Sequence, residues 1–422
     1  MKNMFSEQEA ISFENIPGLP DIQATFTACR IGPDGYLIDI IDFSKKSISR
    51  WPLARIEIPR ALELLEKNIP AERLPFGVLH TDFYKNFQMN LHVAQLSAEG
   101  TLLVCMGDFT NGFFNLAVDT RSGKVTVLPK DYADPLMLYG STGGFSADNR
   151  YWIFIRWPLE DSLDILCGRL KYARCSIGRL SLPDLGIEPL YEFENNDGIH
   201  QIICTTDARY AVFASFKWDA GRACDELITV DLASHRHWRT SVPAPVPAHC
   251  ELDPLDPALF YLSCHNFHLL KGNVILDGPA CLIKMRIMDG QTIIEGKYSD
   301  AQFFRLSQHV PFLYDGRVLV AVTNLPNKID LIDAQSMTLW RRVELFKAEP
   351  LVCAKGASLA CPAYPGSCFA INPSKDGSYL VLEDSDNFII YSVRENRLLD
   401  ARIPRFLPSG YKGTGHTRAA GG

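Results

Sequence analysis

The sequence lacks the features that would assign it to a membrane or to nucleic acid. It contains no run of about 18 apolar residues, so we predict no membrane-spanning helix. Its formal net charge is −7, whereas a general nucleic-acid binder carries a basic surface. The N-terminal segment has no apolar core followed by a small-residue cleavage site, so we expect no secretory signal there. These absences favour a cytoplasmic protein that binds neither membrane nor nucleic acid.

Cysteine is present, but not at the spacing of a metal-binding motif. The 12 cysteines are scattered, and none lies in a Cys-x-x-Cys pair, which argues against a zinc ribbon. We expect most of them to be core thiols in a reducing compartment. Apolar residues make up 47% of the chain, which is ample material for a folded core.

What recurs along the chain is a unit of β-structure. Each copy has a strand, a turn with Asp or Glu followed by Gly or a substitute, and a second, more apolar strand. A third strand then ends in Asp, and a polar turn leads to a fourth strand. The seven copies occupy residues 31–53, 96–128, 145–193, 205–240, 252–296, 312–345 and 372–403. A unit of this kind cannot bury both of its faces alone, so the copies must stack.

Stacked four-stranded repeats are typical of propeller blades arranged around an axis. We therefore predict an all-β fold, a seven-bladed β-propeller of four-stranded blades, in one domain over residues 1–405. The blades are predicted near 26–58, 92–130, 143–194, 200–241, 249–297, 308–346 and 367–404. Residues 60–68 (RALELLEKN) predict a short helical insertion, and 406–422 a flexible tail. Residues 1–30 are candidates for an outer strand of the last blade, which would close the ring.

Several histidines fall at one equivalent position of this repeat. The innermost strand of a blade runs from one face of the ring to a turn on the other, so residues about eight before the turn lie at one channel mouth. At this position are His92, His200, His249 and Gln308, eight before Gly100, Ala208, Pro257 and Gly316, with His309 beside Gln308. The residues that close the second strands return to the same mouth, and they include Asp108, Arg156, Lys217 and His265.

Two interpretations of these histidines are open. A single histidine on such a strand usually forms a structural hydrogen bond to a backbone carbonyl or an acid. Several at one mouth favour a functional site instead, because imidazole is a common ligand of transition metals. Members of this set are His200, His249, His265 and His309, to which Gln308 adds an oxygen ligand or a supporting hydrogen bond.

Two stretches resemble segments of the oligogalacturonate lyase family. From His249 to Asn266 the chain reads HCELDPLDPALFYLSCHN. In that family a His precedes a Ser-Pro and Asp-Pro turn, and the next strand ends in Cys-His-Glu-Gly. From Ser307 the chain reads SQHVPFLYDGRVLV, which resembles the family's Ser-His and Asp-Gly segment two strands later. The rest of the chain shares only the blade pattern.

The resemblance implies a seven-bladed propeller that binds a divalent metal, manganese first, through His and Gln and that catalyses β-elimination. It assigns His249, His265 and His309 to the metal, Gln308 as a possible fourth ligand and His200 as candidate base. Iron, zinc, nickel and calcium are compatible with such ligands to differing degrees. The chain departs from the family where Asn266 and Phe267 replace Glu-Gly, and residues 291–306 have no counterpart of its His-Glu-Phe-Trp segment. We therefore expect a divergent relative that acts on another molecule.

These groups suit proton abstraction next to a carboxylate or carbonyl of a small anionic, sugar-acid-like substrate. That chemistry needs a cation at the developing enolate, a base within reach and a positive group that holds the substrate. His200 or Lys217 is the candidate base, and Arg156 or Arg222 would hold the anionic group because guanidinium matches carboxylate geometry. Further candidates for substrate contacts are His92, His268 and Asp108.

The reaction class stays open at the level of sequence. Elimination, epimerisation and isomerisation share the first proton abstraction, so a lyase and an isomerase or epimerase are both compatible. Lys217 and Arg156 also fit surface residues that extend over Trp218 and Trp157. The rival classes are a non-catalytic propeller that binds other proteins and a metal-dependent hydrolase, since a fold alone does not define a function.

Overall fold

The computed structural model describes residues 9–32, 35–54, 93–96, 102–106, 115–119, 125–127, 144–146, 150–156, 173–181, 187–195, 202–205, 207–219, 222–242, 247–264, 267–270, 273–276, 280–300, 306–324, 328–345, 370–383 and 387–404. All regular structure in these ranges is β-strand. The described part therefore contains no helix that could cross a membrane. The helix predicted over 60–68 and the tail predicted over 406–422 lie outside these ranges.

The strands form seven four-stranded antiparallel sheets and one small two-stranded sheet. The first sheet contains β1 (Glu9–Ser12), β2 (Thr25–Gly32), β3 (Gly35–Asp42) and β4 (Ser47–Ala54), and the second β5 (Val93–Leu96), β6 (Leu102–Met106), β7 (Asn115–Asp119) and β8 (Val125–Val127). The third contains β9 (Gly144–Phe145), β10 (Tyr151–Arg156), β11 (Ala173–Ser181) and β12 (Ile187–Asn195), and the fourth β13 (Ile202–Cys204), β14 (Tyr210–Asp219), β15 (Arg222–Asp231) and β16 (His237–Ser241).

The C-terminal half continues the same pattern with one interruption. The fifth sheet contains β17 (Pro247–Leu252), β18 (Leu259–Cys264), β21 (Cys281–Met288) and β22 (Gln291–Ser299). Between β18 and β21 the chain forms a separate hairpin of β19 (Phe267–Leu270) and β20 (Asn273–Leu276). The sixth sheet contains β23 (Leu306–Tyr314), β24 (Arg317–Asn324), β25 (Lys328–Asp333) and β26 (Thr338–Glu344), and the seventh β27 (Ala370–Pro373), β28 (Tyr379–Glu383), β29 (Asn387–Ser392) and β30 (Arg397–Pro404).

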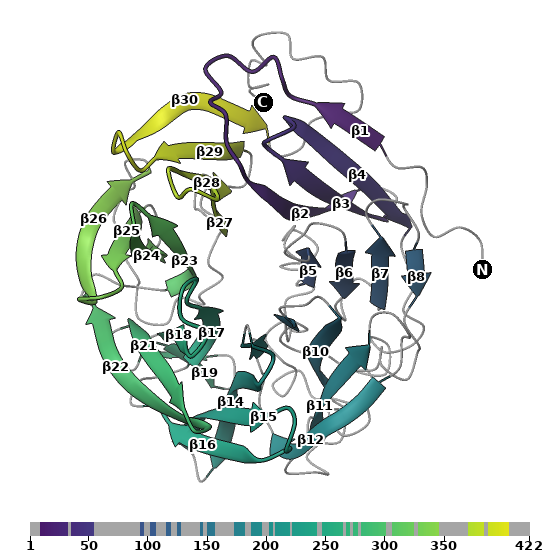
Figure 1. Cartoon of the computed structure of the whole chain (residues 1–422), viewed down its shortest axis with the longest axis vertical. Coiled ribbons are helices and arrows are strands. Elements are labelled where there is room, and N and C mark those ends of the chain that lie inside the picture. The colour runs from purple at the N-terminus through teal and green to yellow at the C-terminus, as the bar shows by residue number, and fades with distance from the viewer. Residues whose placement is uncertain are drawn as a thin grey trace.

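The sheets follow one another around a central axis in chain order, which is the arrangement of a β-propeller (Figure 1). Six of them run from the innermost to the outermost strand in sequence order, and β1, β8, β12, β16, β22, β26 and β30 lie on the outside (Figure 1). Innermost strands of successive sheets contact each other, as β13 does with β17 and β23 with β27. The predicted all-β, propeller-like architecture is confirmed.

The burial of the strands follows from this stacking. β18 lies second in its sheet and is buried at every residue, because neighbouring sheets cover both of its faces. β22 lies at the outer edge of the same sheet, and most of its residues are exposed. Hydrophobic clusters accordingly fill the spaces between sheets. One joins Phe213 in β14 to Phe193 in β12 of the preceding sheet.

The Asp predicted to end each third strand does so in β7, β15 and β25, whereas β4, β11, β21 and β29 end in Ala54, Ser181, Met288 and Ser392. Asp231 ends β15 and accepts backbone N–H bonds from Ala233 and Ser234 through one carboxylate oxygen. Asp333 ends β25 and accepts the equivalent bonds from Gln335 and Ser336. These N–H donors lower the pKa of both carboxyl groups, because they stabilise the charged form.

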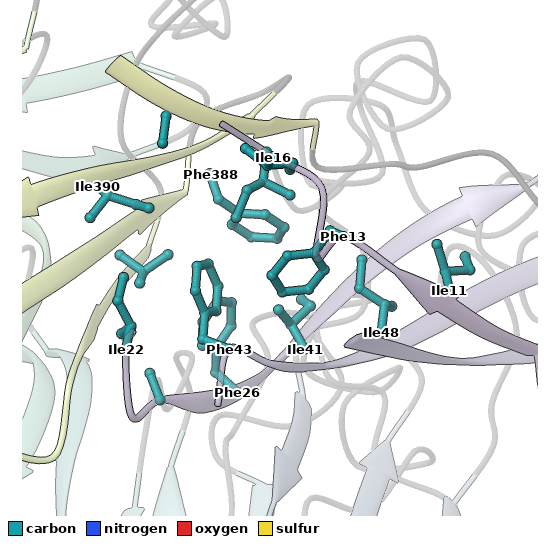
Figure 2. Close-up of a cluster of buried hydrophobic side chains, with 14 residues drawn as sticks. Ile11, Phe13, Ile16, Ile22, Phe26, Ile41, Phe43, Ile48, Phe388 and Ile390 are labelled. Atoms are coloured by element: carbon teal, nitrogen blue, oxygen red, sulfur yellow. The ribbon is translucent and has the colours of Figure 1, made fainter. Parts of the chain in front are cut away.

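The ring is closed differently from the expectation that residues 1–30 add an outer strand to the last sheet. β1 pairs with β4 in the first sheet, and the last sheet takes all of its strands from residues 370–404. The connection between β1 and β2 instead packs against the last sheet, where Phe13 and Ile22 share a buried cluster with Phe388 and Ile390 (Figure 2). The Lys375 backbone N–H also donates a 2.8 Å hydrogen bond to the carbonyl of Gln23. Closure therefore depends on buried apolar side chains.

Two buried carboxylates are paired with arginine on the neighbouring strand. Asp39 in β3 opposes Arg50 in β4, and the guanidinium donates two hydrogen bonds of 2.8 Å to the carboxylate. Asp330 in β25 opposes Arg342 in β26 in the same way, with bonds of 2.6 and 2.9 Å. Arg342 also reaches Asp300 at the end of the fifth sheet, so this pair joins adjacent sheets.

Candidate functional site

His309 is the predicted metal ligand whose surroundings the structure defines most fully. It lies in β23 and is 2% exposed. Its Nε2 donates a 2.9 Å hydrogen bond to the backbone carbonyl of Tyr261 in β18 of the preceding sheet. Burial lowers the pKa of His309 to about 4, so the ring is neutral near pH 7. Because the proton is on Nε2, a lone pair remains on Nδ1.

The Nδ1 of His309 is buried and has no hydrogen-bond partner among the described residues. A buried polar atom without a partner costs about 1–3 kcal/mol. Histidines that ligate metals commonly donate their other N–H to a backbone carbonyl, which fixes the tautomer and the ring orientation. The same bond also fits a structural histidine that ties two sheets together. The contacts therefore restrict any metal bond of His309 to Nδ1.

His249 lies in β17, the innermost strand of the fifth sheet. Like His309, it directly follows a register shift in the pairing with the second strand. The ladder between β17 and β18 shifts register between Pro247 and His249, and that between β23 and β24 shifts between Leu306 and His309. β17 and β23 contact each other. Bulges redirect side chains and recur next to functional sites. His249 is half-buried, and its backbone N–H donates a 3.3 Å bond to the hydroxyl of Ser263.

For the three predicted cationic residues, the structure describes the position of the backbone. Lys217 lies near the end of β14, where it opposes Cys224 of β15. Arg222 begins β15, so both belong to the same end of the β14–β15 hairpin. β14 contacts β17, the strand of His249. Arg156 is the last residue of β10, one sheet earlier. The side chains of these three residues lie outside the described part of the structure.

The remaining predicted residues are not tested by the described structure. His268 lies in β19 and Gln308 in β23, and their side chains are outside the described part. Four predicted residues lie wholly outside the described ranges, namely His92, Asp108, His200 and His265. Their assignments stay predictions.

No group of three or more His, Cys, Asp or Glu side chains arranged to hold a metal ion occurs within the described ranges. The predicted set depends on His265 and Gln308, whose side chains lie outside the described part of the structure. Of the predicted ligands that are described, His309 meets the requirement for a neutral, oriented imidazole. These features of His309 fit a metal ligand and a structural histidine alike, so the ligand assignments stay predictions.

Two groups at this site were not anticipated from the sequence. Tyr261 contributes its backbone carbonyl, which no side-chain pattern reveals. Ser263 contributes a hydroxyl that is fully buried. It is the one hydroxyl-bearing small residue in the buried run LFYLSC, and a polar residue at such a position is a usable signal.

The comparisons with known proteins support the fold. No protein-family model matches the chain, and no curated protein matches it in sequence. An oligogalacturonate lyase in complex with manganese is similar in structure, with a TM-score of 0.52 at 10% identity over 89% of this chain and 86% of that one. Hydrazine synthase of Kuenenia stuttgartiensis has a TM-score of 0.50 at 13% identity, over 75% of this chain and 86% of that chain.

A third similar structure is a Bacteroides fragilis protein provisionally assigned as a 6-phosphogluconolactonase. Its TM-score is 0.51 at 12% identity, and the match covers 92% of this chain and 97% of that one. Identities this low define the fold class and no family. The chain is thus similar to propeller proteins of differing activity, and its own function has to be argued from its residues.

Proposed function

We propose that this protein is a metal-dependent lyase or isomerase built on a closed seven-bladed propeller. It would remove a proton next to a carboxylate or carbonyl of a small anionic, sugar-acid-like substrate. The observation that carries the proposal is the state of His309, a neutral imidazole whose Nε2–H is fixed on the Tyr261 carbonyl and whose Nδ1 lone pair is without a partner in the described structure.

The protonation state of His309 favours this role. A metal ligand must be deprotonated, and competition with protons weakens binding when the pKa of the imidazole is high. Burial lowers the pKa of His309 to about 4, so no proton competes for Nδ1 at neutral pH. The orientation is also fixed before any ligand binds, because the Tyr261 carbonyl belongs to the buried strand β18.

The second support is the position of His249 on the adjoining innermost strand. Both histidines directly follow a register shift. A bulge of this kind changes the direction of a side chain from the one it would have in a regular ladder. We propose that His249, His265 and His309, with Gln308, hold the ion. Manganese is the first candidate, as the bound ion named for the similar oligogalacturonate lyase.

The roles of the remaining residues follow from the chemistry. A divalent cation at this place would polarise the substrate carboxylate and stabilise the enolate that proton removal creates. His200 or Lys217 accepts the proton. Arg156 or Arg222 holds the anionic group, with His92, His268 and Asp108 as further substrate contacts. Fixed donors and cations of this kind favour the charged transition state without reorganisation.

The test begins with metal content. Protein purified without a nickel column is analysed by plasma mass spectrometry and titrated with manganese by calorimetry, next to the variant with His249→Ala and His309→Ala. The matched control is His237→Ala, an exposed histidine in β16. Near-stoichiometric metal that is lost only in the double variant supports the proposal. Lyase and epimerase assays on uronides and other carboxylate substrates then separate the reaction classes.

A second candidate function is a non-catalytic interaction scaffold. Its support is the set of exposed apolar side chains on two outer strands, Ile293 and Ile294 in β22 and Leu339 in β26. A protein that neither carries nor binds metal would favour this alternative. The histidines would then be structural, and a search for protein partners would come first.

We also propose a reducing, cytoplasmic location. Its support is that Cys175, Cys204, Cys250, Cys264 and Cys281 are all buried free thiols.

A further inference from the structure

Cys264 and Cys281 face each other across two adjacent strands of the fifth sheet. Cys264 is the last residue of β18, Cys281 is the first of β21, and the two are direct partners in the antiparallel ladder. Both side chains are buried free thiols. The other buried free cysteines have different ladder partners, Phe193 for Cys175, Ala211 for Cys204 and Leu262 for Cys250.

The position allows a disulfide without movement of the backbone. Directly opposed residues of an antiparallel pair have Cα atoms about 4.5 or 5.5 Å apart, depending on the type of pair. Disulfides span Cα separations of about 4.4–6.8 Å. The ladder therefore places the two cysteines at a Cα separation that a disulfide can span.

The two cysteines also flank a chain segment that is not part of the fifth sheet. β19 and β20 lie between β18 and β21 in the chain and pair with each other as a separate two-stranded sheet. A bond between Cys264 and Cys281 would close this segment into a covalent loop at its base. Closing a loop removes conformations from any opened state of the segment, so the hairpin would open less often.

Solvent lies close to the pair on one side. Cys281 opposes Ser299 of the outer strand β22, and Ser299 is exposed. Lys297 opposes Ile283, two residues along β21 from Cys281. The Cys281 sulfur is therefore one side chain away from the surface, at the end of a strand.

We propose that Cys264 and Cys281 are a reversible oxidation site, at which a small-molecule disulfide converts the two thiols into a cross-strand disulfide that clamps the base of the β19–β20 hairpin. One cysteine, as its thiolate, attacks a sulfur of the small disulfide and releases one small thiol, which leaves a mixed disulfide on the protein. The other cysteine attacks the protein sulfur of that mixed disulfide and releases the second small thiol. The protein loses two hydrogen atoms, and the small disulfide gains them as two thiols. His265, a proposed metal ligand, follows Cys264 directly and His268 lies in β19, so the cysteine pair adjoins the metal site proposed above, while formation of the disulfide is measured without metal and without an activity assay.

The test uses the full chain in buffers with increasing ratios of oxidised to reduced glutathione. After exchange is quenched with acid, free thiols are counted in denaturant, and disulfides are mapped by mass spectrometry of non-reducing digests. We expect a peptide pair linked through Cys264 and Cys281, the loss of two thiols per chain, and full reversal by dithiothreitol. Hydrogen exchange of residues 267–276 should slow several-fold in the oxidised form.

Two variants and one control sharpen the result. Cys264→Ser and Cys281→Ser should each abolish the linked peptide pair and the slowed exchange. Cys250→Ser removes a buried thiol of the same sheet and should leave both unchanged. The disulfide map of the wild-type protein tests the proposal even if a serine variant fails to fold. A native protein that keeps both thiols reduced in the most oxidising buffer, or that links other cysteines instead, overturns the proposal.

Discussion

The imidazole of His309 and the backbone carbonyl of Tyr261 form a buried hydrogen bond of 2.9 Å that joins the innermost strand of the sixth sheet to the second strand of the fifth. The bond requires a proton on Nε2, and burial lowers the pKa of His309 to about 4, so the ring is neutral near pH 7. Protonation would place a second N–H on Nδ1, which is buried and has no acceptor among the described residues. The pair therefore links the protonation of one side chain to the contact between two sheets.

The first prediction concerns the dependence of stability on pH. The pKa of His309 is lowered from 6.5 to about 4 in the folded protein, so the unfolded chain binds more protons between these values. The free energy of unfolding should therefore fall as pH falls from about 6.5 to about 4, by up to about 3 kcal/mol from this group. Denaturant unfolding of the EDTA-treated protein across this pH range measures it.

The matched variant for this prediction is His309→Gln, whose amide has a donor for the Tyr261 carbonyl but does not titrate. Its unfolding free energy should lack the His309 contribution to the slope between pH 4 and 6.5. His237→Gln, at an exposed position, should keep the wild-type slope. Equal slopes in all three proteins would contradict a buried neutral His309.

The second prediction concerns metal. If the proposed site binds manganese, the folded state gains about 2.7 kcal/mol of stability at a free manganese concentration 100 times the dissociation constant. The melting temperature should rise with manganese, and EDTA should reverse the rise. His309→Ala should be insensitive to both. A wild-type melting temperature that stays constant over the titration would count against the metal part of the proposed function.

The third prediction concerns the buried ion pair of the first sheet. Arg50→Met leaves the carboxylate of Asp39 buried without its partner, which should cost about 3–5 kcal/mol of unfolding free energy. The control is Arg397→Met, which removes the exposed pair with Glu395 and should cost less than about 1 kcal/mol. Replacing Asp39 and Arg50 together by apolar residues should restore much of the loss. Urea unfolding of the four proteins measures these differences.

The fourth prediction concerns the closure of the ring. Phe13 is fully buried and packs edge-to-face on Phe43 with ring centroids 5.3 Å apart. Phe13→Ala should cost about 3–5 kcal/mol. Hydrogen exchange should accelerate most in β1, β2 and β29, where the first and last sheets meet. Phe213→Ala removes an equally buried ring from β14 and should leave exchange at this closure unchanged. Equal local exchange in both variants would contradict closure through Phe13.

The fifth prediction concerns Gly377, in the turn between β27 and β28. Its φ is +67°, and an added Cβ would lie 2.0 Å from the backbone carbonyl oxygen of Leu313 in the preceding sheet. Gly316 has a φ of +74° and open space around an added Cβ, so Gly316→Ala measures the cost of the backbone conformation alone. Gly377→Ala should be less stable than Gly316→Ala by at least about 2 kcal/mol, because a backbone atom must move. Thermal unfolding of both variants tests this difference.

The amino-acid sequence alone predicted what depends on local pattern. Alternating apolar residues and Asp-containing turns define strands and their order, because period and turn chemistry act within a few residues. Asp231 and Asp333 thus end third strands and bond the following turns, as the repeat indicates. The same pattern placed His249 and His309 on innermost strands, since strand order in a sheet follows sequence order there.

Only the tertiary structure decided which groups meet between sheets. The carbonyl that holds His309, the register shifts beside both histidines and the opposition of Cys264 and Cys281 depend on how strands pair and sheets pack. The sequence predicts that residues 1–30 add an outer strand to the last sheet, but residues 13–24 contribute buried side chains to that sheet instead. Hydrophobic burial is non-directional, so the sequence shows that Phe13 and Ile22 will be buried, whereas the surface that covers them is set by the geometry of the whole ring.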